Sequence, residues 1–195
     1  KGTYDGTSHP AVTVSSGLVP SSGWVVKYGE STSSYLGSVP MVTNVNDNRE
    51  RWVWFEHDDY EPVKIPYTVK ISPKTITPTV SLSPTSFTYD GTAKTPTVTV
   101  TDEKTVLELG TDYTVQYANN TDAGTAKVTV TAVEQGNYTW SPAAEKSFAI
   151  ANATITTDGA FKNYSGDYDG KPHGITVDTS KITTKGSQPI TIRYR

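Results

Sequence analysis

Short stretches in which hydrophobic and polar residues alternate recur along the whole chain. Alternation with a period of two places the two sets of side chains on opposite faces of a β-strand. No stretch repeats its apolar residues at the i, i+3, i+4, i+7 spacing of an amphipathic helix. The pattern therefore predicts an all-β protein with strands at AVTV (11–14), WVVKY (24–28), YTVKI (67–71), TVTV (97–100), YTVQY (113–117), KVTVTAV (127–133), SFAI (147–150) and ITIRY (190–194).

Clusters of turn-forming residues separate these strands. Examples are LGTD (109–112), NNTDAG (119–124) and EQGN (134–137). Gly and Asn adopt positive φ at low cost, and Asp accepts hydrogen bonds from nearby backbone amides. Many short strands joined by such turns indicate a β-sandwich or a small barrel.

The chain repeats itself at intervals of about 80 residues, which is typical of structural modules used in series. Tyr-Asp-Gly begins three similar segments, YDGTSHPAVTV (4–14), YDGTAKTPTVTV (89–100) and YDGKPHGITV (168–177). The segment KISPKTIT (70–77) matches AIANATIT, which lies 79 residues later. These matches predict a divergent first repeat at 1–77, a complete repeat at 78–156 and a partial third repeat at 157–195. The first repeat has no counterpart of TVSLSPTSFT (79–88), so we expect the chain to be part of a longer array.

The repeats resemble the YDG and MBG repeats of bacterial surface proteins, which are bacterial Ig-like modules. The resemblance covers nearly the whole chain. Three stretches carry it: the YDG motifs, the segment GTDYTVQYANNTDAGTAKVTVTA (110–132) and GNYT (136–139). It implies tandem small Ig-like β-sandwiches, the last incomplete, in an exported protein that is secreted or held at the cell surface. The first repeat departs from the family pattern between Ser15 and Asp59.

The recurrent motif comprises nine residues, and its chemistry suggests a local structural role. Asp can bind neighbouring amides, Gly can adopt positive φ, and Tyr offers an apolar ring with a hydroxyl that can reach a backbone group. A binding loop is the alternative, because His9, Lys94 and His173 follow at the same place. A shared metal site would not replace His by Lys, which favours the structural role. The nine residues are Tyr4, Asp5, Gly6, Tyr89, Asp90, Gly91, Tyr168, Asp169 and Gly170.

Composition narrows the possible partners. The net charge is −3, and no stripe of Lys and Arg is present, so we expect neither nucleic acid nor an anionic membrane as a partner. The absence of cysteine excludes disulfides, thiolate metal sites and cysteine nucleophiles. No run reaches the roughly 18–20 apolar residues that span a bilayer, so we expect no membrane insertion. Any export signal or anchor would lie outside this sequence.

No constellation of catalytic residues stands out, and we expect no enzyme activity, cofactor or metal. The acidic residues Glu56, Asp58, Asp59 and Glu61 follow one predicted strand end and its turn, which is typical of a solvated rim rather than a cleft. The segment 46–48 (NDN) could supply oxygens to Ca²⁺ together with Asp58 and Asp59, but it lacks the spacing of a calcium-binding loop.

The segment RERWVWFEHDDY (49–60) is the clearest departure from the repeat pattern. When it is aligned with KVTVTAVEQGNY (127–138), Val53 and Phe55 take core positions, while Trp52 and Trp54 take solvent-facing positions. Indoles at i and i+2 on an outer face could stack on sugar rings or pack against a neighbouring domain. Alternatively, a register shift of one residue would place them in the core. Arg49 and Arg51 are candidate cation-π partners.

Two functions therefore remain open. The leading hypothesis is a structural stalk or spacer, in which short linkers with Pro73 and Pro78 hold successive repeats extended. Its partners would be neighbouring repeats of the same chain. The second hypothesis is a module that binds a glycan or a host surface protein through aromatic residues of the first repeat, namely Trp52, Trp54, Tyr60 and Trp24.

Overall fold

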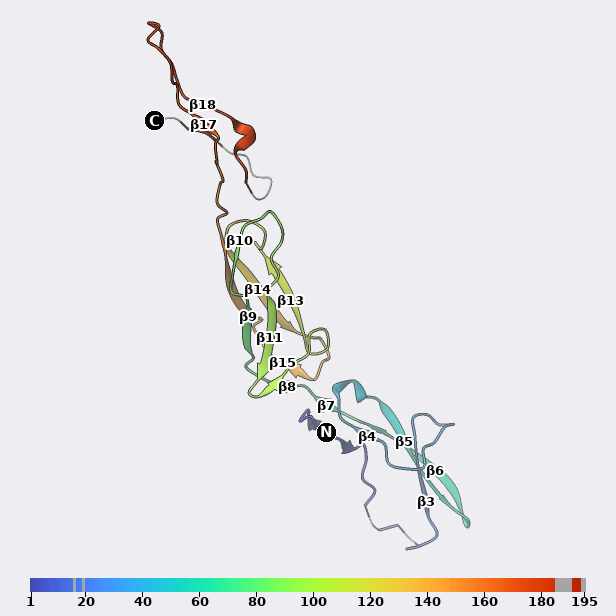
Figure 1. Cartoon of the computed structure of the whole chain (residues 1–195). Coiled ribbons are helices and arrows are strands. Elements are labelled where there is room, and N and C mark those ends of the chain that lie inside the picture. The colour runs from blue at the N-terminus through green and yellow to red at the C-terminus, as the bar shows by residue number, and fades with distance from the viewer. Residues whose placement is uncertain (16, 19, 185–190, 194–195) are drawn as a thin grey trace. The chain divides into compact units, whose positions relative to one another are not determined.

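The computed structural model describes residues 1–15, 17–18, 20–184 and 191–193, and almost all of its regular structure is β (Figure 1). The strands are β1 (Gly2–Thr3), β2 (His9–Pro10), β3 (Val25–Gly29), β4 (Met41–Val42), β5 (Glu50–His57), β6 (Tyr60–Thr68), β7 (Ile71–Ser72), β8 (Lys74–Thr75), β9 (Thr79–Ser83), β10 (Ser86–Thr88), β11 (Thr97–Asp102), β12 (Thr105–Val106), β13 (Tyr113–Ala118), β14 (Gly124–Ala132), β15 (Tyr138–Thr139), β16 (Ala144–Ala151), β17 (Phe161–Lys162) and β18 (Thr176–Val177). The described residues also form two short 3-10 turns, η1 (Val45–Asp47) and η2 (Thr179–Lys181). The predicted all-β, sandwich-type fold class is confirmed.

The chain forms two compact units. Unit 1 comprises Lys1–Thr79, Thr101–Thr114 and Thr131–Ala143, and unit 2 comprises Val80–Val100, Val115–Val130 and Ala144–Arg195. These limits cut across the sequence repeats, because residues 101–114 and 131–143 belong to unit 1. The repeat limits 1–77, 78–156 and 157–195 therefore stay a prediction.

Unit 1 is built around an antiparallel sheet of β3, β5 and β6, in the order β3-β5-β6. In the register of this sheet, Val53 lies opposite Tyr28 on one side and Ile65 on the other. Val53 is buried, whereas every residue of β6 except Tyr67 is exposed. Strand β6 is consequently the thinly covered edge of the sheet. The parallel pair β1-β7 and the antiparallel pair β2-β4 lie in the same unit.

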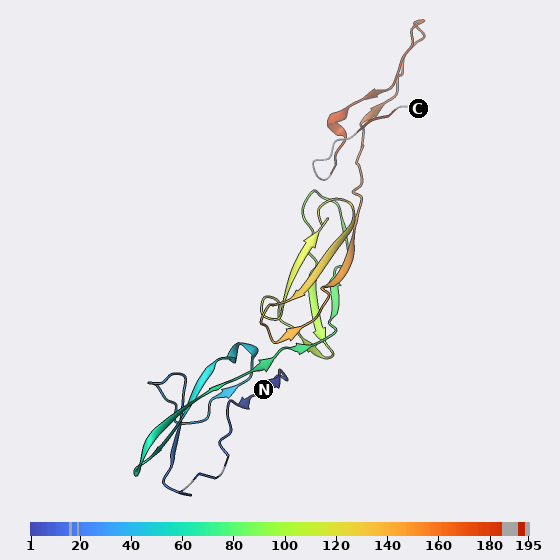
Figure 2. The same cartoon turned by 180° about the vertical axis from the view of Figure 1, so that it is seen from behind.

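Unit 2 shows the alternation predicted for its strands. Along β14, Ala126, Val128 and Val130 are fully buried, and the residues between them point outward. Strand β14 runs antiparallel to β16, and β16 runs parallel to β10 (Figures 1 and 2). The sheet order is β10-β16-β14-β13, and β9 and β11 belong to a second sheet with β12. Two sheets with inward-facing valines are the pattern of a sandwich core.

Three predicted strands do not form as expected. YTVKI (67–71) is interrupted at residues 69–70, between the end of β6 and the start of β7. Residues 11–14 (AVTV) form no strand; Val12 and Val14 instead line an apolar pocket with Phe55, Ile65 and other residues of the β3-β5-β6 sheet. The Ala11 amide donates to the Pro40 carbonyl at 2.8 Å, next to the β2-β4 pair, and Val12 and Val14 are half-buried while Thr13 between them is exposed. Of ITIRY (190–194), residues 190 and 194 lie outside the described residues, and residues 191–193 carry no strand.

Candidate functional site

The three Tyr-Asp-Gly motifs form one recurrent turn. Asp5 Oδ1 accepts a hydrogen bond from the Thr7 amide at 2.9 Å, Asp90 Oδ1 from the Thr92 amide at 2.9 Å, and Asp169 Oδ1 from the Lys171 amide at 3.0 Å. The glycine that follows each Asp has positive φ, namely 78°, 83° and 72°. These angles are open to glycine and strained for other residues, which explains the Gly in the motif.

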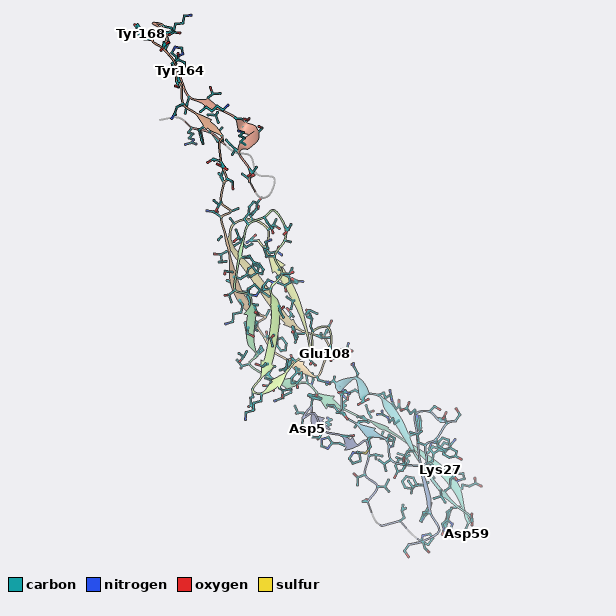
Figure 3. All side chains as sticks on the ribbon, viewed as in Figure 1. Asp5, Lys27, Asp59, Glu108, Tyr164 and Tyr168 are labelled. Carbon is teal, nitrogen blue, oxygen red and sulfur yellow. The ribbon has the colours of Figure 1, made fainter. Side chains whose placement is uncertain are left out.

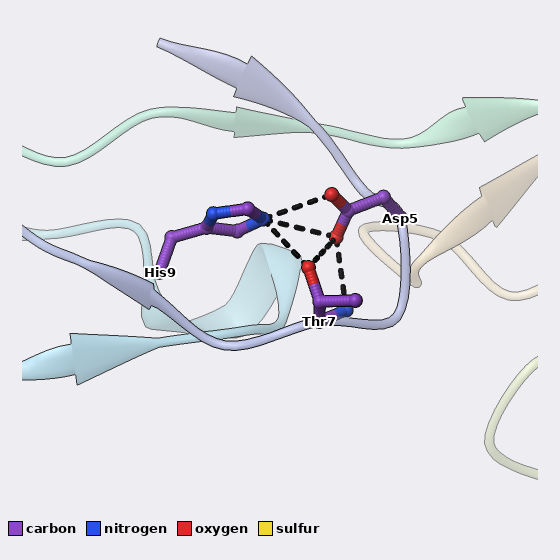
Figure 4. A network of polar contacts seen from close by, with 3 residues as sticks. All are labelled: Asp5, Thr7 and His9. Carbon is purple, nitrogen blue, oxygen red and sulfur yellow. Dashed lines mark hydrogen bonds and ion pairs between the residues drawn. The ribbon is translucent and has the colours of Figure 1, made fainter.

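A basic side chain four residues after each Asp closes the turn. His9 Nε2 lies 2.8 Å from Asp5 Oδ2, and the Thr7 hydroxyl joins both groups (Figure 4). His173 Nε2 lies 2.8 Å from Asp169 Oδ1. In the second copy, the buried Lys94 donates to Asp90, and its backbone amide donates to the Asn120 carbonyl. In all three copies the contact between the Asp and the basic side chain is local, and this geometry favours the structural role.

Hydrogen bonds to the charged carboxylate lower the pKa of Asp5 to about 2. The backbone amide of Thr7 is the largest cause, followed by the Thr7 hydroxyl and His9. The pKa of Asp90 is lowered chiefly by Lys94, and the pKa of Asp169 chiefly by His173. A folded-state pKa below the unfolded value means that the carboxylate stabilises the fold above about pH 4 and loses that effect as the pH falls toward 2.

We predict that the Thr7→Ala variant raises the pKa of Asp5 part of the way toward its usual value of 3.8. The substitution removes the hydroxyl donor and retains the amide donor. The measurement is a titration of the Asp5 carboxyl carbon by NMR, with Ser8→Ala as the matched control in the same turn. An unchanged Asp5 midpoint in Thr7→Ala would contradict this account of the turn.

The motif tyrosines have three different environments. The half-buried Tyr4 packs edge-on against the ring of Tyr138, with centroids 5.3 Å apart. The sequence suggests a hydrogen bond from the tyrosine hydroxyl to a backbone group, and this ring contact is a different role. Burial is the main cause that raises the pKa of Tyr138 to about 12. Tyr89 is half-buried, whereas Tyr168 is 97% exposed (Figure 3). The tyrosine therefore has no single role across the three copies.

The expected exposure of Trp54 is wrong. Trp54 does lie on the sheet face opposite Val53, but only 7% of its surface is exposed. The Tyr35 ring lies 5.5 Å from the indole, and Lys64 Nζ lies 4.2 Å from its centroid. Lys64 Nζ also donates to the Thr32 carbonyl at 2.7 Å, which holds the covering loop in place. Trp54 thus packs beneath a loop and cannot serve as an open platform.

The neighbouring side chains also differ from the expectation. Trp52 is half-buried between Gly29 and Pro66, its partners on the adjacent strands. Arg49 pairs with Glu30 at 2.5 Å, and the buried Arg51 donates to the Asp47 carbonyl at 3.0 Å. In the part of the chain that the structure describes, the cations that lie over aromatic rings are instead two lysines, Lys64 over Trp54 and Lys27 over Tyr35. The sequence pattern around the aromatic residues does not predict these two contacts. Lys64 lies on β6 and Trp54 on β5, while Lys27 lies on β3 and Tyr35 lies in the segment after it.

The other two candidate aromatics come together at the turn between β5 and β6. The Trp24 and Tyr60 rings stack with centroids 5.8 Å apart, and His57 lies 5.1 Å from Trp24 and 5.0 Å from Tyr60. Tyr60 is 53% exposed. A pocket of about 270 Å³ adjoins this cluster and is lined by Gly23, Val25, Glu56, His57, Asp58, Tyr60 and Pro62. His57 is not a predicted site residue, because no repeat or spacing in the sequence marks it.

The acidic candidates do not assemble into a metal site within the described residues. Asp47 accepts the amides of Thr43 and Asn44, and Glu56 accepts Lys27 Nζ at 2.6 Å. No group of three or more His, Asp or Glu side chains in the described part of the chain is placed to share a metal ion. The candidate sites are therefore the three Asp turns and the Trp24-His57-Tyr60 cluster.

Comparison with known proteins identifies no relative. No family model, curated protein or solved structure matches the chain. Among the described helices, none has the length and apolar character needed to cross a membrane.

Proposed function

We propose that this chain is a non-catalytic structural module of the YDG/MBG type, which acts as a stalk or spacer in an exported bacterial surface protein. In this proposal the chain is extracellular, at the cell surface or secreted, and its partners are neighbouring repeats. The observation that carries the proposal is the parallel pairing of β10 and β16. Strand β10 lies near the start of the middle repeat and β16 at its end. Parallel strands place the entry and exit of the repeat at opposite ends, which suits modules threaded in series.

Solution scattering tests the stalk. A compact globule of 195 residues has a radius of gyration of about 16 Å, and an unfolded chain of this length has roughly 47 Å. A stalk of folded repeats predicts an intermediate value, together with a folded circular dichroism spectrum. A radius near that of the compact globule would contradict the proposal.

A stalk exposed at a cell surface must also avoid pairing of its edge strands with strands of other molecules. The edge strand β6 contains a proline residue that opposes such pairing. The Val69 amide donates to the Arg49 carbonyl, and the register is regular from Val63 to Thr68, so in this part of β6 the backbone amides of odd-numbered residues point toward β5 and those of even-numbered residues point outward. Pro66 occupies one of the outward positions and has no N–H to offer. Proline on an edge strand blocks the addition of another strand.

We predict that Pro66→Thr promotes self-association. The substitution restores an outward donor on an edge that also exposes Val63 and Ile65. The measurement is sedimentation equilibrium, in which the average mass of Pro66→Thr should rise with concentration while the wild-type mass does not. Pro73→Thr is the matched control, because it makes the same change outside any strand. Equal masses for the two variants would contradict this role of Pro66.

The Trp24-His57-Tyr60 cluster favours a second candidate function, which is binding of a glycan or a host surface protein. An exposed aromatic ring beside Glu56 and Asp58 combines a stacking surface with acceptors for sugar hydroxyls. Titration with a polysaccharide panel should change the tryptophan fluorescence of the wild type and leave that of Tyr60→Ala unchanged. A panel without any response in the wild type would remove the support for glycan binding.

A further inference from the structure

We propose that the parallel ladder of β10 and β16 is a mechanical clamp that carries load through the middle repeat. Ser86, Phe87 and Thr88 lie opposite Ala149, Ile150 and Ala151, respectively. Backbone bonds extend the ladder at both ends, from the Ala149 amide to the Thr85 carbonyl at 3.0 Å and from the Tyr89 amide to the Ala151 carbonyl at 2.8 Å. This inference rests on the proposed function, because a stalk is the setting in which the chain is under tension.

The direction of the strands decides how they would resist that tension. Tension enters β10 from the N-terminal side and leaves β16 on the C-terminal side. Since the two strands are parallel, the load pulls them in opposite directions along their own axes. All hydrogen bonds of the ladder are then sheared together, whereas a pull on two adjacent strand ends would open them one at a time. Shared loading slows forced unfolding, which is governed by the unfolding rate.

The packing beneath the ladder suits this role. The rings of Phe87 and Phe148 meet edge to face, with centroids 5.5 Å apart, one from each strand of the pair. Phe148 and Ile150 are buried on the inner side of β16. Apolar packing on this side limits the access of water to the ladder bonds, so that water does not readily replace them as they are strained.

The Tyr-Asp-Gly turn begins where the ladder ends. Tyr89 donates the last ladder bond, and Asp90 and Gly91 then turn the chain away. Unit 1 repeats the arrangement in its parallel pair β1-β7, where the Tyr4 amide donates to the Ser72 carbonyl at 2.8 Å. The motif thus holds the end of the clamp strand in both units. In this proposal the recurrent turn has a structural role at the end of the clamp strand, and that role does not require a ligand.

The decisive experiment pulls the full chain in two directions by single-molecule force spectroscopy. The chain contains no cysteine, so engineered cysteines give unique attachment points. Handles at the two termini shear the ladder. Handles at Ala93→Cys and Asn152→Cys, both exposed and both beyond the same end of the ladder, peel it from Tyr89 onward. We expect a rupture force several-fold higher in shear than in peeling, and equal forces would overturn the clamp.

A pair of proline variants tests the ladder bonds themselves under terminal pulling. Tyr89→Pro removes an amide that donates to β16, whereas Thr88→Pro removes the preceding amide, which points away from β16. We expect Tyr89→Pro to lower the rupture force and Thr88→Pro to leave it near the wild-type value. A similar force in both variants would overturn the clamp. The two-direction experiment does not depend on these variants folding.

The outcomes separate this proposal from the stalk proposal. A radius of gyration near that of a compact globule would contradict the stalk proposal. It would not affect the expected difference in rupture force between the two pulling directions. Equal forces in the two directions would contradict the clamp and leave an extended scattering profile intact.

Discussion

Replacing Trp54 with alanine is expected to lower the free energy of unfolding of unit 1 by about 3–5 kcal/mol, the usual range for truncating a buried tryptophan. The indole is 7% exposed, and it loses its contacts with the Tyr35 ring and Lys64 when it is removed. A folded unit of this size has only about 5–15 kcal/mol of stability in total, so the loss is a large fraction. Urea unfolding followed by far-UV circular dichroism measures the change.

The control for this prediction is Tyr60→Ala. Tyr60 is 53% exposed and stacks on Trp24, so its removal should cost about 1 kcal/mol or less. The comparison also separates packing from binding, because Trp54 belongs to the covered face and Tyr60 to the exposed cluster. If Trp54→Ala were as stable as the wild type, the assignment of Trp54 to the folded interior would be wrong.

Truncation of Phe148 is expected to have a comparable effect on unit 2. Phe148 is 3% exposed on β16, and Phe148→Ala should cost about 3–5 kcal/mol through the cavity it leaves and the lost ring contact with Phe87. Because this packing lies beneath the β10-β16 ladder, the Tyr89 and Ala149 amides should also exchange faster with solvent. Hydrogen exchange by NMR measures both the global and the local change.

Phe161→Ala is the matched control, since Phe161 lies in the same unit and is 50% exposed. Its free energy of unfolding should stay within about 0.5 kcal/mol of the wild type. A loss in Phe161→Ala as large as that in Phe148→Ala would show that ring size, rather than burial at the ladder, determines the effect.

Local chemistry made the recurrent turn predictable. Asp binds amides within two residues of itself, and the glycine after it adopts positive φ, so the Asp-Gly turn forms over a few bonds and needs no distant partner. The ion pairs of Asp5, Asp90 and Asp169 with the residue four positions later are equally local. The equivalence of His9, Lys94 and His173 could therefore be found from the repeats alone.

The sequence by itself determined the all-β class and the inward face of strands such as β14, because an alternating pattern states directly which side chains avoid water. Only the tertiary structure decided what covers each face. Trp54 and Val53 alternate as predicted, yet a loop containing Tyr35 buries the outer side as well. Likewise, AVTV (11–14) packs on a sheet without joining a ladder. Periodicity records on which side a residue lies, whereas its neighbours on that side come from distant segments.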